Sequence, residues 1–266
     1  MRLVSVGEVT LDHYLSQAQV SVGGISLNFA IHAKRAGVQN VSLISRVGHE
    51  DAQIVLDTLK QESIDTTFVQ VLEGKTASIE IDVLADGDRV FPEGGYRANV
   101  LENFRLSHEE LRFIQKQDIL VTYYTGRTNS HFQQLRNLSF SGKRVADFGD
   151  WARRKHDLEL LLESLEHIDL VFISGNEEAV EALSPYSSKN RLIIVTLGAA
   201  GSVALVAGKL MRQEAQKVKA VVDTTGCGDA FQAAFTVHYF QTGNIRGALA
   251  KGALQAARVL KHYGAH

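Results

Sequence analysis

The chain of 266 residues contains a single cysteine and no hydrophobic stretch of membrane-spanning length. Cys227 alone cannot form an internal disulfide, and the amino-terminal residues lack the apolar run and the small-residue cleavage site of a signal peptide. Apolar stretches such as 192–195 are far shorter than the roughly 20 residues that a spanning helix needs. We therefore expect a protein of the reducing cytoplasm with no membrane partner.

An excess of charge of either sign is also missing. With 28 basic and 30 acidic side chains the net charge is -2, which gives no reason to expect a nucleic-acid partner and leaves small molecules as ligands. Hydrophobic residues make up 45% and charged residues 22%, which excludes a disordered, collagen-like or disulfide-built protein. Because no repeat or linker divides the chain, we expect one domain over residues 1–266.

Several catalytic motifs are absent. Paired cysteines and H-E-x-x-H are missing, and His262 with His266 is interpreted as a solvated tail rather than a zinc site. No G-x-S-x-G elbow occurs. Residues 74–76 resemble the end of a Walker A motif, but Val69 stands where that motif requires glycine. The first strand is not followed by G-x-G-x-x-G, which counts against a Rossmann-type oxidoreductase.

The hydrophobic pattern alternates between strands and helices. A short strand over 3–6 ends at Gly7, and residues 24–35 have helical spacing. Ser107 and Glu110 have the spacing of a capping box, which predicts a helix start. The alternation predicts an α/β fold with a doubly wound, mostly parallel sheet flanked by helices. Further strands are expected over 41–45, 119–123, 144–147, 170–174 and 192–197, and further helices over 52–61, 107–116 and 158–165.

One region departs from this alternation. Apolar and polar residues alternate strictly over 77–83, and a turn over 86–88 leads into 89–91. This pattern predicts a hairpin with one apolar face. We expect a small β lid formed by about 11–22 and 76–92, which closes over the ligand and pairs with a second subunit through its uncovered face.

The strongest motif lies at 223–229, before a helical run of small and apolar residues. The glycines at 226 and 228 open a helix whose first amides and dipole favour an anion. Asp229 stands in the first turn, where we expect its carboxylate to stay ionised and to act as a general base toward a substrate hydroxyl. The alternative interpretation is an ordinary glycine turn with an aspartate that favours the helix start.

Two further glycine-containing segments suit small ligands. Residues 196–201 follow a strand directly, where glycines allow a nucleotide to approach the backbone, although a hairpin turn into 202–206 explains them equally well. Asp12 follows the first strand, and the glycine pair 23–24 precedes Asn28 on one helix face. These side chains suit sugar hydroxyls, while a solvated aspartate and a capped helix are the alternative.

From Gly7 onward the sequence resembles the PfkB family of ribokinase-like carbohydrate kinases over essentially its whole length. The family motif D-T-x-G-A-G-D corresponds to residues 223–229, with Cys227 in place of the usual alanine. The resemblance implies that Asp229 is the catalytic base and that the amides of Gly226, Cys227 and Gly228 form an anion hole. It also implies ATP as phosphoryl donor, Mg²⁺, and a monovalent cation such as K⁺ near the anion hole.

The resemblance extends to the ligand-binding segments. The family features G-x-x-x-x-D and G-G-x-x-x-N fall on Gly7 with Asp12 and on Gly24 with Asn28. The residues that it implies for the sugar are Asp12, Gly23, Gly24, Asn28 and Arg89, and those for the nucleotide are Thr196, Gly198, Gly201 and Thr225.

The family motif N-x-x-E is out of register in this chain. Its glutamate helps to hold magnesium through water, but the third residue after Asn176 is Ala179. Either Glu177 or Glu178 is available instead, and we assign the role to Glu178. A solvated helix start is the alternative interpretation.

Within the family, four segments resemble the fructoselysine 6-kinases: residues 87–91, 93–95, 147–151 and 263–266. This implies phosphorylation of a ketosamine, a sugar joined to the amine of an amino acid. A PfkB-family kinase for fructose or for 2-keto-3-deoxygluconate is the alternative. A nucleotide-binding regulator without catalysis is a further one.

Cys227 invites a chemical prediction. A thiol at a helix N-terminus, among amides arranged for an anion, is expected to have a stabilised and reactive thiolate. The alternative is that Cys227 only replaces alanine as a small buried residue.

Overall fold

The computed structural model describes residues 1–124 and 130–266, except the side chains of Asp157 and Leu160. Its large sheet has the strand order β14-β13-β12-β11-β10-β9-β1-β4-β5, and all pairs from β5 to β12 are parallel. Only β13 and β14 run antiparallel to their neighbours. The strands are β1 (Arg2–Val6), β4 (Asn40–Gly48), β5 (Asp65–Leu72), β9 (Ile119–Tyr123), β10 (Lys143–Asp150), β11 (Leu170–Ser174), β12 (Leu192–Thr196), β13 (Ser202–Val206) and β14 (Lys209–Gln213).

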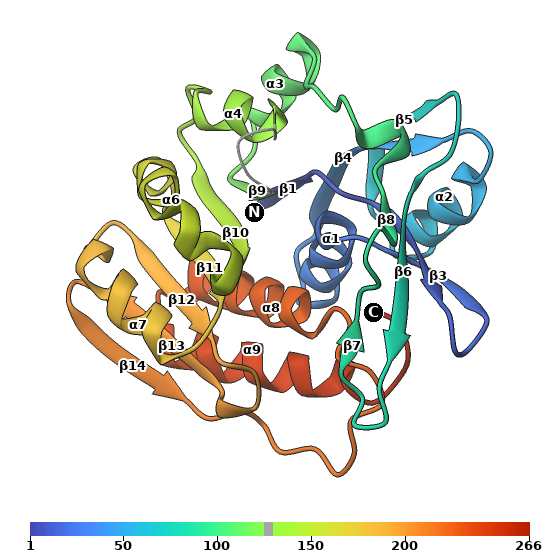
Figure 1. Ribbon diagram of the computed structural model, residues 1–266. Helices are drawn as coiled ribbons and strands as arrows, with labels where there is room; N and C mark the ends of the chain where they lie inside the picture. Colours follow the sequence, from blue (N-terminus) through green and yellow to red (C-terminus); the bar gives the residue numbers. More distant parts are fainter. Residues whose placement is uncertain (125–129) are drawn as a thin grey trace.

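Helices cover both faces of this sheet, as Figure 1 shows. One apolar cluster joins the sheet to α1 (Ile25–Arg35), α2 (Ala52–Gln61), α8 (Cys227–Thr242) and α9 (Ile245–Val259). Two other clusters join the opposite face to the remaining helices. These are α3 (His108–Ile114), α4 (Ser130–Arg136), α5 (Trp151–Arg154), α6 (Leu158–Leu165) and α7 (Glu177–Leu183), with 3-10 turns at Asn99–Leu101, Lys155–Asp157, Ser184–Tyr186 and Gly198–Ala200. The doubly wound α/β prediction is confirmed. None of the described helices combines the length and apolarity needed to cross a bilayer.

The winding direction changes at β1. From β1 the sheet continues through β4 on one side and through β9 on the other. Loops that leave β1 and β9 therefore diverge, and ligands of open α/β sheets bind in the crevice that such loops leave at the carboxyl edge. Gly7 and the end of β9 at Tyr123 lie at this point.

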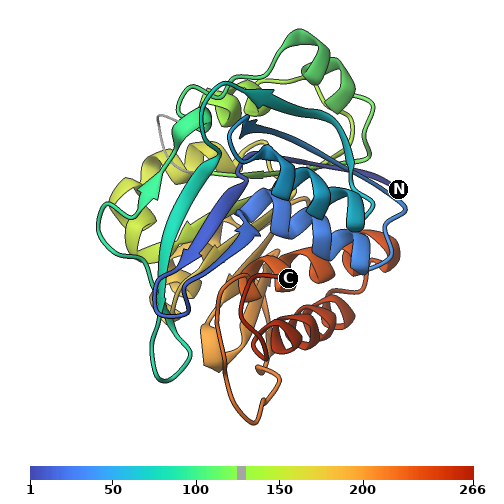
Figure 2. The ribbon, with the colours of Figure 1, turned by 90° about the vertical axis from the view of Figure 1, so that its right-hand side faces the viewer.

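A smaller mixed sheet stands beside the large one and serves as the lid (Figures 1 and 2). Its order is β3-β2-β6-β7, and β8 also pairs with β6. The predicted hairpin is confirmed, because β6 and β7 pair antiparallel through Asp82 with Val90 and Val83 with Arg89. The strands are β2 (Thr10–Tyr14), β3 (Gln19–Gly23), β6 (Ala77–Val83), β7 (Arg89–Val90) and β8 (Tyr96–Arg97).

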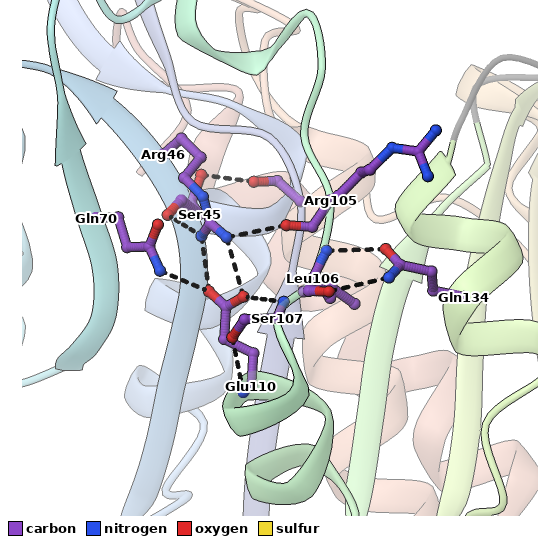
Figure 3. Close-up of polar contacts among 9 residues, drawn as sticks. Ser45, Arg46, Gln70, Arg105, Leu106, Ser107, Glu110 and Gln134 are labelled. Atoms are coloured by element: carbon purple, nitrogen blue, oxygen red, sulfur yellow. Dashed lines mark hydrogen bonds and ion pairs between the residues drawn. The ribbon is translucent and has the colours of Figure 1, made fainter.

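A buried ion pair joins the large sheet to the start of α3 (Figure 3). The Arg46 guanidinium donates to both carboxylate oxygens of Glu110, at 2.7 and 2.9 Å, and to the carbonyl of Arg105. Glu110 also accepts from the Ser107 amide, while the Ser107 hydroxyl accepts from the Glu110 amide, which completes the predicted capping box. The Arg46 guanidinium further stacks over the Phe104 ring. Both charges of the pair are therefore balanced by contacts inside the protein.

Candidate active site

The glycine turn before α8 has the geometry that its sequence predicts. Gly226 is the N-cap residue with φ 73°, and Cys227, Gly228 and Asp229 form the first turn of the helix. A Cβ at Gly226 would lie 2.4 Å from the Cβ of Ala265, so glycine is required for space as well as for its positive φ. The Cys227 amide donates to the Thr224 carbonyl at 3.3 Å, and this contact must open if all three predicted amides are to face an anion.

Asp229 is buried in the first turn of α8. Its Oδ2 accepts a hydrogen bond from Asn28 Nδ2 of α1 at 2.8 Å. Burial raises the pKa of Asp229 to about 7, with Asp147 and Asp12 adding to the rise, while Asn28 and Arg89 oppose it. At neutral pH Asp229 is therefore only partly ionised, in contrast to the expectation that its carboxylate stays ionised. The missing element was desolvation, which outweighs the helix dipole here.

The predicted sugar residues gather beside Asp229. Asn28 is 4% exposed, and its Oδ1 has no hydrogen-bond partner among the described residues, although Nδ2 is bound to Asp229. Asp12 on β2 accepts from the Thr10 hydroxyl at 2.5 Å. A Cβ at Gly23 would lie 2.1 Å from Asp12 Oδ2, so this close approach requires glycine. Burial raises the pKa of Asp12 to about 7, with Glu8 and Asp223 contributing.

Gly24, next in the chain, is the N-cap residue of α1 with φ 99°. A Cβ there would lie 2.7 Å from the Val9 Cα and 2.8 Å from the Glu8 carbonyl oxygen. The glycine pair thus lets the start of α1 pack directly on the segment between β1 and β2. This packing brings Asn28, one turn into the helix, to the Asp229 carboxylate.

Asp223, the first residue of the motif, has a structural role that sequence reasoning did not assign. It is fully buried and accepts from the Tyr14 hydroxyl at 2.7 Å, the Gly264 amide at 3.0 Å and the Thr225 amide at 2.8 Å. These three bonds join the lid strand β2, the last residues of the chain and the glycine turn. No local sequence pattern connects Tyr14 with a residue 209 positions away.

Arg89 reaches the glycine turn from the tip of the lid hairpin. Its Nη1 donates to the Thr224 carbonyl at 3.0 Å and to the Thr224 hydroxyl at 3.1 Å. Its charge lowers the pKa of both Asp229 and Cys227 against the effect of burial. Arg89 was predicted as a sugar residue, and the structure places it at the turn where the anion is expected.

A second buried carboxylate, Asp147, lies at the end of β10. Gln232 of α8 donates to its Oδ2 at 2.9 Å, and the Gly149 amide donates to its Oδ1 at 2.8 Å. Burial raises the pKa of Asp147, and Asp147 in turn raises that of Asp229. No local sequence pattern connects Gln232 with a residue 85 positions away.

Glu8 completes the carboxylates of the site. It follows the end of β1, and the Tyr96 hydroxyl of the lid strand β8 opposes the rise of its pKa. Burial raises its pKa. Its charge also raises the pKa of Asp12 and of Tyr123 at the end of β9.

The predicted nucleotide residues lie at the carboxyl end of β12. Thr196 ends that strand, and a 3-10 turn over Gly198–Ala200 leads into the antiparallel strand β13. Gly198 and Gly201 have φ of 57° and 96°, and the Leu197 amide donates to the Gly201 carbonyl at 2.8 Å. The segment therefore forms the hairpin turn expected from one interpretation, and this turn lies where the other interpretation places the nucleotide. Thr225 lies apart from it, in the glycine turn, with its amide bound to Asp223.

Both candidate magnesium residues lie in exposed ion pairs at the start of α7. Asn176 caps this helix by accepting from the Ala179 amide at 3.2 Å. Glu177 binds Arg212 through both oxygens, whereas Glu178 has a single contact with Lys155 at 3.3 Å. Among the described residues no three histidines, cysteines or acids cluster as a ready-made metal site. Within the described part of the chain the second carboxylate oxygen of Glu178 has no contact, so Glu178 fits a metal held through water better than Glu177 does.

Cys227 does not have the predicted thiolate character. Burial raises the pKa of its thiol, and Asp229 and Asp223 add to the rise, while Arg89 opposes it. The helix dipole favours a thiolate at this turn, but the neighbouring carboxylates disfavour a second negative charge at the same place.

A family model and several curated relatives match nearly the whole chain. The model of the pfkB family of carbohydrate kinases matches residues 3–266. The chain belongs to this family. It is therefore a carbohydrate kinase, and the lid, the glycine turn and Asp229 lie where its catalytic site is expected.

Three curated relatives span nearly the whole chain. The fructoselysine 6-kinase of Escherichia coli (strain K12) is 30% identical over 99% of this chain and 98% of its own length. A fructosamine kinase of Bacillus subtilis (strain 168) is 26% identical over 100% and 93%. A 2-dehydro-3-deoxygluconokinase of Escherichia coli is 22% identical over 99% and 96%.

Solved structures confirm the ribokinase-like fold. The adenosine kinase from Sinorhizobium meliloti superposes with a TM-score of 0.85 at 18% identity, over 100% of this chain and 95% of its own. Ribokinase from Thermotoga maritima gives 0.77 at 18% identity, over 100% and 94%. An uncharacterized sugar kinase from Pyrococcus horikoshii in complex with ATP gives 0.77 at 20% identity, over 99% of this chain and 93% of its own.

Proposed function

We propose that this kinase transfers the γ-phosphoryl group of ATP to a hydroxyl of a ketosamine, converting fructoselysine to fructoselysine 6-phosphate. The observation that carries the proposal is the position of Asp229. Its buried carboxylate, with a pKa of about 7, stands in the first turn of the helix whose N-terminus suits a phosphate. Base and anion-binding group are thus adjacent, as phosphoryl transfer to a hydroxyl requires.

Asp229 acts as the base in this proposal. Asn28 binds Oδ2, which fixes the carboxylate and leaves Oδ1 to accept the proton of the sugar hydroxyl. A base whose pKa lies near the working pH combines a sufficient deprotonated fraction with a sufficient affinity for the proton. Asp147, held by Gln232, sustains this pKa through its charge.

The glycine turn and Arg89 stabilise the moving phosphoryl group. The amides of Gly226, Cys227 and Gly228 and the α8 dipole supply fixed positive potential, and Arg89 adds a full charge beside Thr224. Mg²⁺, held through water by Glu178, would offset the charge of the nucleotide phosphates. The nucleotide itself is assigned to the turn of Thr196, Gly198 and Gly201 and to Thr225. A requirement for K⁺ stays a prediction, which a comparison of potassium with tetramethylammonium salts tests.

Asp12, Gly23, Gly24 and Asn28 form the sugar side. The unpartnered Oδ1 of Asn28 is an acceptor for a sugar hydroxyl, since a buried polar atom without a partner is costly. Asp12→Ala should raise the KM for the sugar about ten- to hundredfold, because hydrogen bonds to a charged group are lost. The KM for ATP should change little, and an unchanged sugar KM would remove Asp12 from the pocket.

The choice of ketosamine rests on the relatives that carry that activity and on the matching segments of the sequence. A fructokinase or a 2-keto-3-deoxygluconate kinase would share every catalytic group described above. A nucleotide-binding regulator would retain the glycine turns without needing Asp229. The cytoplasm is the proposed location, which suits a chain with one cysteine.

The lid is proposed to close over the sugar and to pair with the lid of a second copy. Val20, Val90, Phe91 and Tyr96 expose more than 40% of their surface on this small sheet or beside it. Sheet edges and apolar faces of this kind favour pairing. A monomer by light scattering at all concentrations would refute the dimer, and hydrogen exchange of 76–92 that ignores the sugar would refute closure.

A coupled assay of ADP release tests the proposed reaction. Fructoselysine, fructose and 2-keto-3-deoxygluconate are compared as acceptors at saturating ATP and Mg²⁺. We expect the highest kcat/KM with fructoselysine. A preference for either other sugar selects the corresponding alternative, and no ADP release with any acceptor favours the regulator.

A further inference from the structure

The tip of the lid hairpin is bonded to one residue of the glycine turn, Thr224. The Thr224 amide donates to the Gly87 carbonyl at 3.1 Å, and the Thr224 hydroxyl donates to Asp88 Oδ1 at 3.0 Å. Arg89 Nη1 donates to both the carbonyl and the hydroxyl of Thr224, at 3.0 and 3.1 Å. The amide, the carbonyl and the hydroxyl of Thr224 therefore all have partners on the lid.

The backbone of the hairpin tip is shaped for this contact. Gly87 has φ 85°, and a Cβ there would lie 2.7 Å from the Val221 carbonyl oxygen. Only glycine therefore allows the tip to approach the segment that leads into the glycine turn. Asp88 Oδ1 also accepts from the Arg89 amide at 2.9 Å, so the oxygen that meets Thr224 is held in place within the hairpin itself.

The Thr224 carbonyl has a second donor, and that donor belongs to the predicted anion hole. The Cys227 amide donates to this carbonyl at 3.3 Å, so it must leave Thr224 before it can bind a phosphate. Its departure is less costly when the carbonyl keeps another donor, because a poorly solvated backbone carbonyl without a partner is unfavourable. Arg89, at 3.0 Å and with a full charge, is that donor. The lid tip thus affects how easily the Cys227 amide can turn to an anion.

A second contact joins the lid to the same turn. Tyr14 of β2 donates to Asp223 Oδ2, and Asp223 Oδ1 accepts from the Thr225 amide. Tyr14 lies two positions after Asp12 on the same strand, and alternate residues of a strand share a face. The strand that carries the proposed sugar ligand therefore also contacts the glycine turn, and the lid holds the residues on both sides of Thr224.

We propose that Thr224 is a positioning residue through which the tip of the lid prepares the glycine turn for the phosphate. The inference rests on the proposed function, in which the amides of this turn stabilise the moving phosphoryl group. While the tip is in place, Arg89 keeps the Thr224 carbonyl bonded, and the Cys227 amide can turn to the phosphate. When Thr224 is detached from the tip, its carbonyl depends on the Cys227 amide, and the anion hole stays incomplete. The lid thereby acts on the phosphate side of the site as well as on the sugar side.

Substitutions that remove the side-chain contacts and leave the backbone contacts test this role. Thr224→Val keeps the size of the side chain and removes the hydroxyl, and Asp88→Ala removes the acceptor on the lid. Asp88→Asn retains an acceptor oxygen and is the conservative variant. Thr58→Val is the matched control, since the Thr58 hydroxyl donates to the Ile54 carbonyl within α2. ADP release with the acceptor that the wild type prefers and urea unfolding are measured for each variant and for the double variant of Thr224 and Asp88.

We expect Thr224→Val and Asp88→Ala each to lower kcat about three- to tenfold, the loss of one hydrogen bond. The KM for the sugar should change less than about threefold, because neither residue lies among the proposed sugar ligands. The double variant should lose no more than Thr224→Val alone, since both substitutions remove the same contact. Asp88→Asn and Thr58→Val should stay within about twofold of the wild type. Losses that multiply in the double variant, or a lower free energy of unfolding with an unchanged kcat, would mean that Thr224 has only a structural role.

The single cysteine of the chain gives a second measurement that needs no turnover. In protein made with isotope-labelled cysteine, nuclear magnetic resonance detects one backbone amide, that of Cys227. We expect Mg²⁺ and a non-hydrolysable ATP analogue to shift this signal in the wild type and in Asp88→Asn, and to shift it by less than about half as much in Asp88→Ala. No shift in the wild type, or equal shifts in the wild type and Asp88→Ala, would overturn the role of Thr224 while the kinase activity stands. If the wild type phosphorylates no acceptor, the proposed function fails, and the Cys227 signal still decides whether the lid tip controls this amide.

Discussion

Glu110 and Asp229 are both buried carboxylates, yet the chain compensates them in different ways. Glu110 meets the Arg46 guanidinium at 2.7 and 2.9 Å inside a closed network (Figure 3). From the described side chains Asp229 accepts a single hydrogen bond, from the neutral amide of Asn28, and burial raises its pKa to about 7. The Arg46 cation balances the charge of Glu110, which therefore has a structural role. The absence of a cation in contact among the described residues leaves the second able to take up a proton.

This difference shows how one fold separates stability from chemistry. A buried ion pair is costly to break because the surviving partner stays charged in a poorly solvated place. A buried carboxylate without such a partner destabilises the folded chain when it ionises, but its proton affinity then suits a base at neutral pH. Removing the charge of Glu110 should therefore lower the stability of the fold, whereas removing the charge of Asp229 should lower the activity without unfolding the chain.

The largest effect is expected on stability when the closed network is opened. Glu110→Gln leaves the Arg46 guanidinium buried without its counter-charge, and we expect a loss of about 3–5 kcal/mol in the free energy of unfolding. Urea denaturation with an unchanged m-value measures it. The same substitution at Glu177, whose pair with Arg212 is exposed, should leave the free energy of unfolding nearly unchanged. Equal costs at the two positions would contradict the comparison.

Asp229→Asn should abolish most activity without unfolding the chain. We expect kcat to fall about a hundredfold or more, because the substrate hydroxyl loses its base. The wild-type rate should rise with pH up to about 7 as Asp229 deprotonates, and the variant should lack this limb. Turnover and circular dichroism are measured on the same preparation. Turnover close to that of the wild type would remove Asp229 from its role.

The dependence of stability on pH sharpens the contrast. Because the pKa of Asp229 is about 7 in the folded chain and near 4 in the unfolded one, the folded state binds more protons between these values. The stabilising contribution is complete below pH 4 and is lost as the pH rises to 7, by up to about 1.4 kcal/mol per pH unit. Asp229→Asn should lose less stability than the wild type between pH 5 and 8. Parallel urea-midpoint curves for the two chains would show that the carboxylate is not desolvated.

The elements that the sequence predicts well are those with a local signal. The capping box at Ser107, the hairpin over 77–91 and the glycine turn before Asp229 were each readable from neighbouring residues. Contacts between distant segments were not. Gln232 binds Asp147 across 85 positions, and Tyr14 binds Asp223 across 209. A sequence pattern carries no information on such pairs, nor on the desolvation that follows from them.

Edge elements were missed for a related reason. Strand β5 at one edge of the large sheet buries few of its side chains, so its residues show no strong alternation. Helix α9 has a good apolar face, but its packing partner α8 is needed to recognise it as part of the core. Recognition of β5 and α9 depends on which of their side chains are buried, and burial is a property of the assembled fold.

Cys227 should show the smallest effect. Its thiol has a pKa raised by burial, with Asp229 and Asp223 disfavouring a further negative charge, so little thiolate forms at neutral pH. We expect alkylating reagents to inactivate the enzyme slowly at pH 7, and Cys227→Ala to keep kcat within about threefold of the wild type. The inactivation rate is followed with iodoacetamide, with and without Mg²⁺ and ATP. Asp229→Asn removes one of the opposing charges and should speed alkylation of Cys227, measured by mass spectrometry. Rapid alkylation of the wild type at pH 7 would mean that the helix dipole outweighs desolvation at this turn, and the comparison with Glu110 would then lose its physical basis.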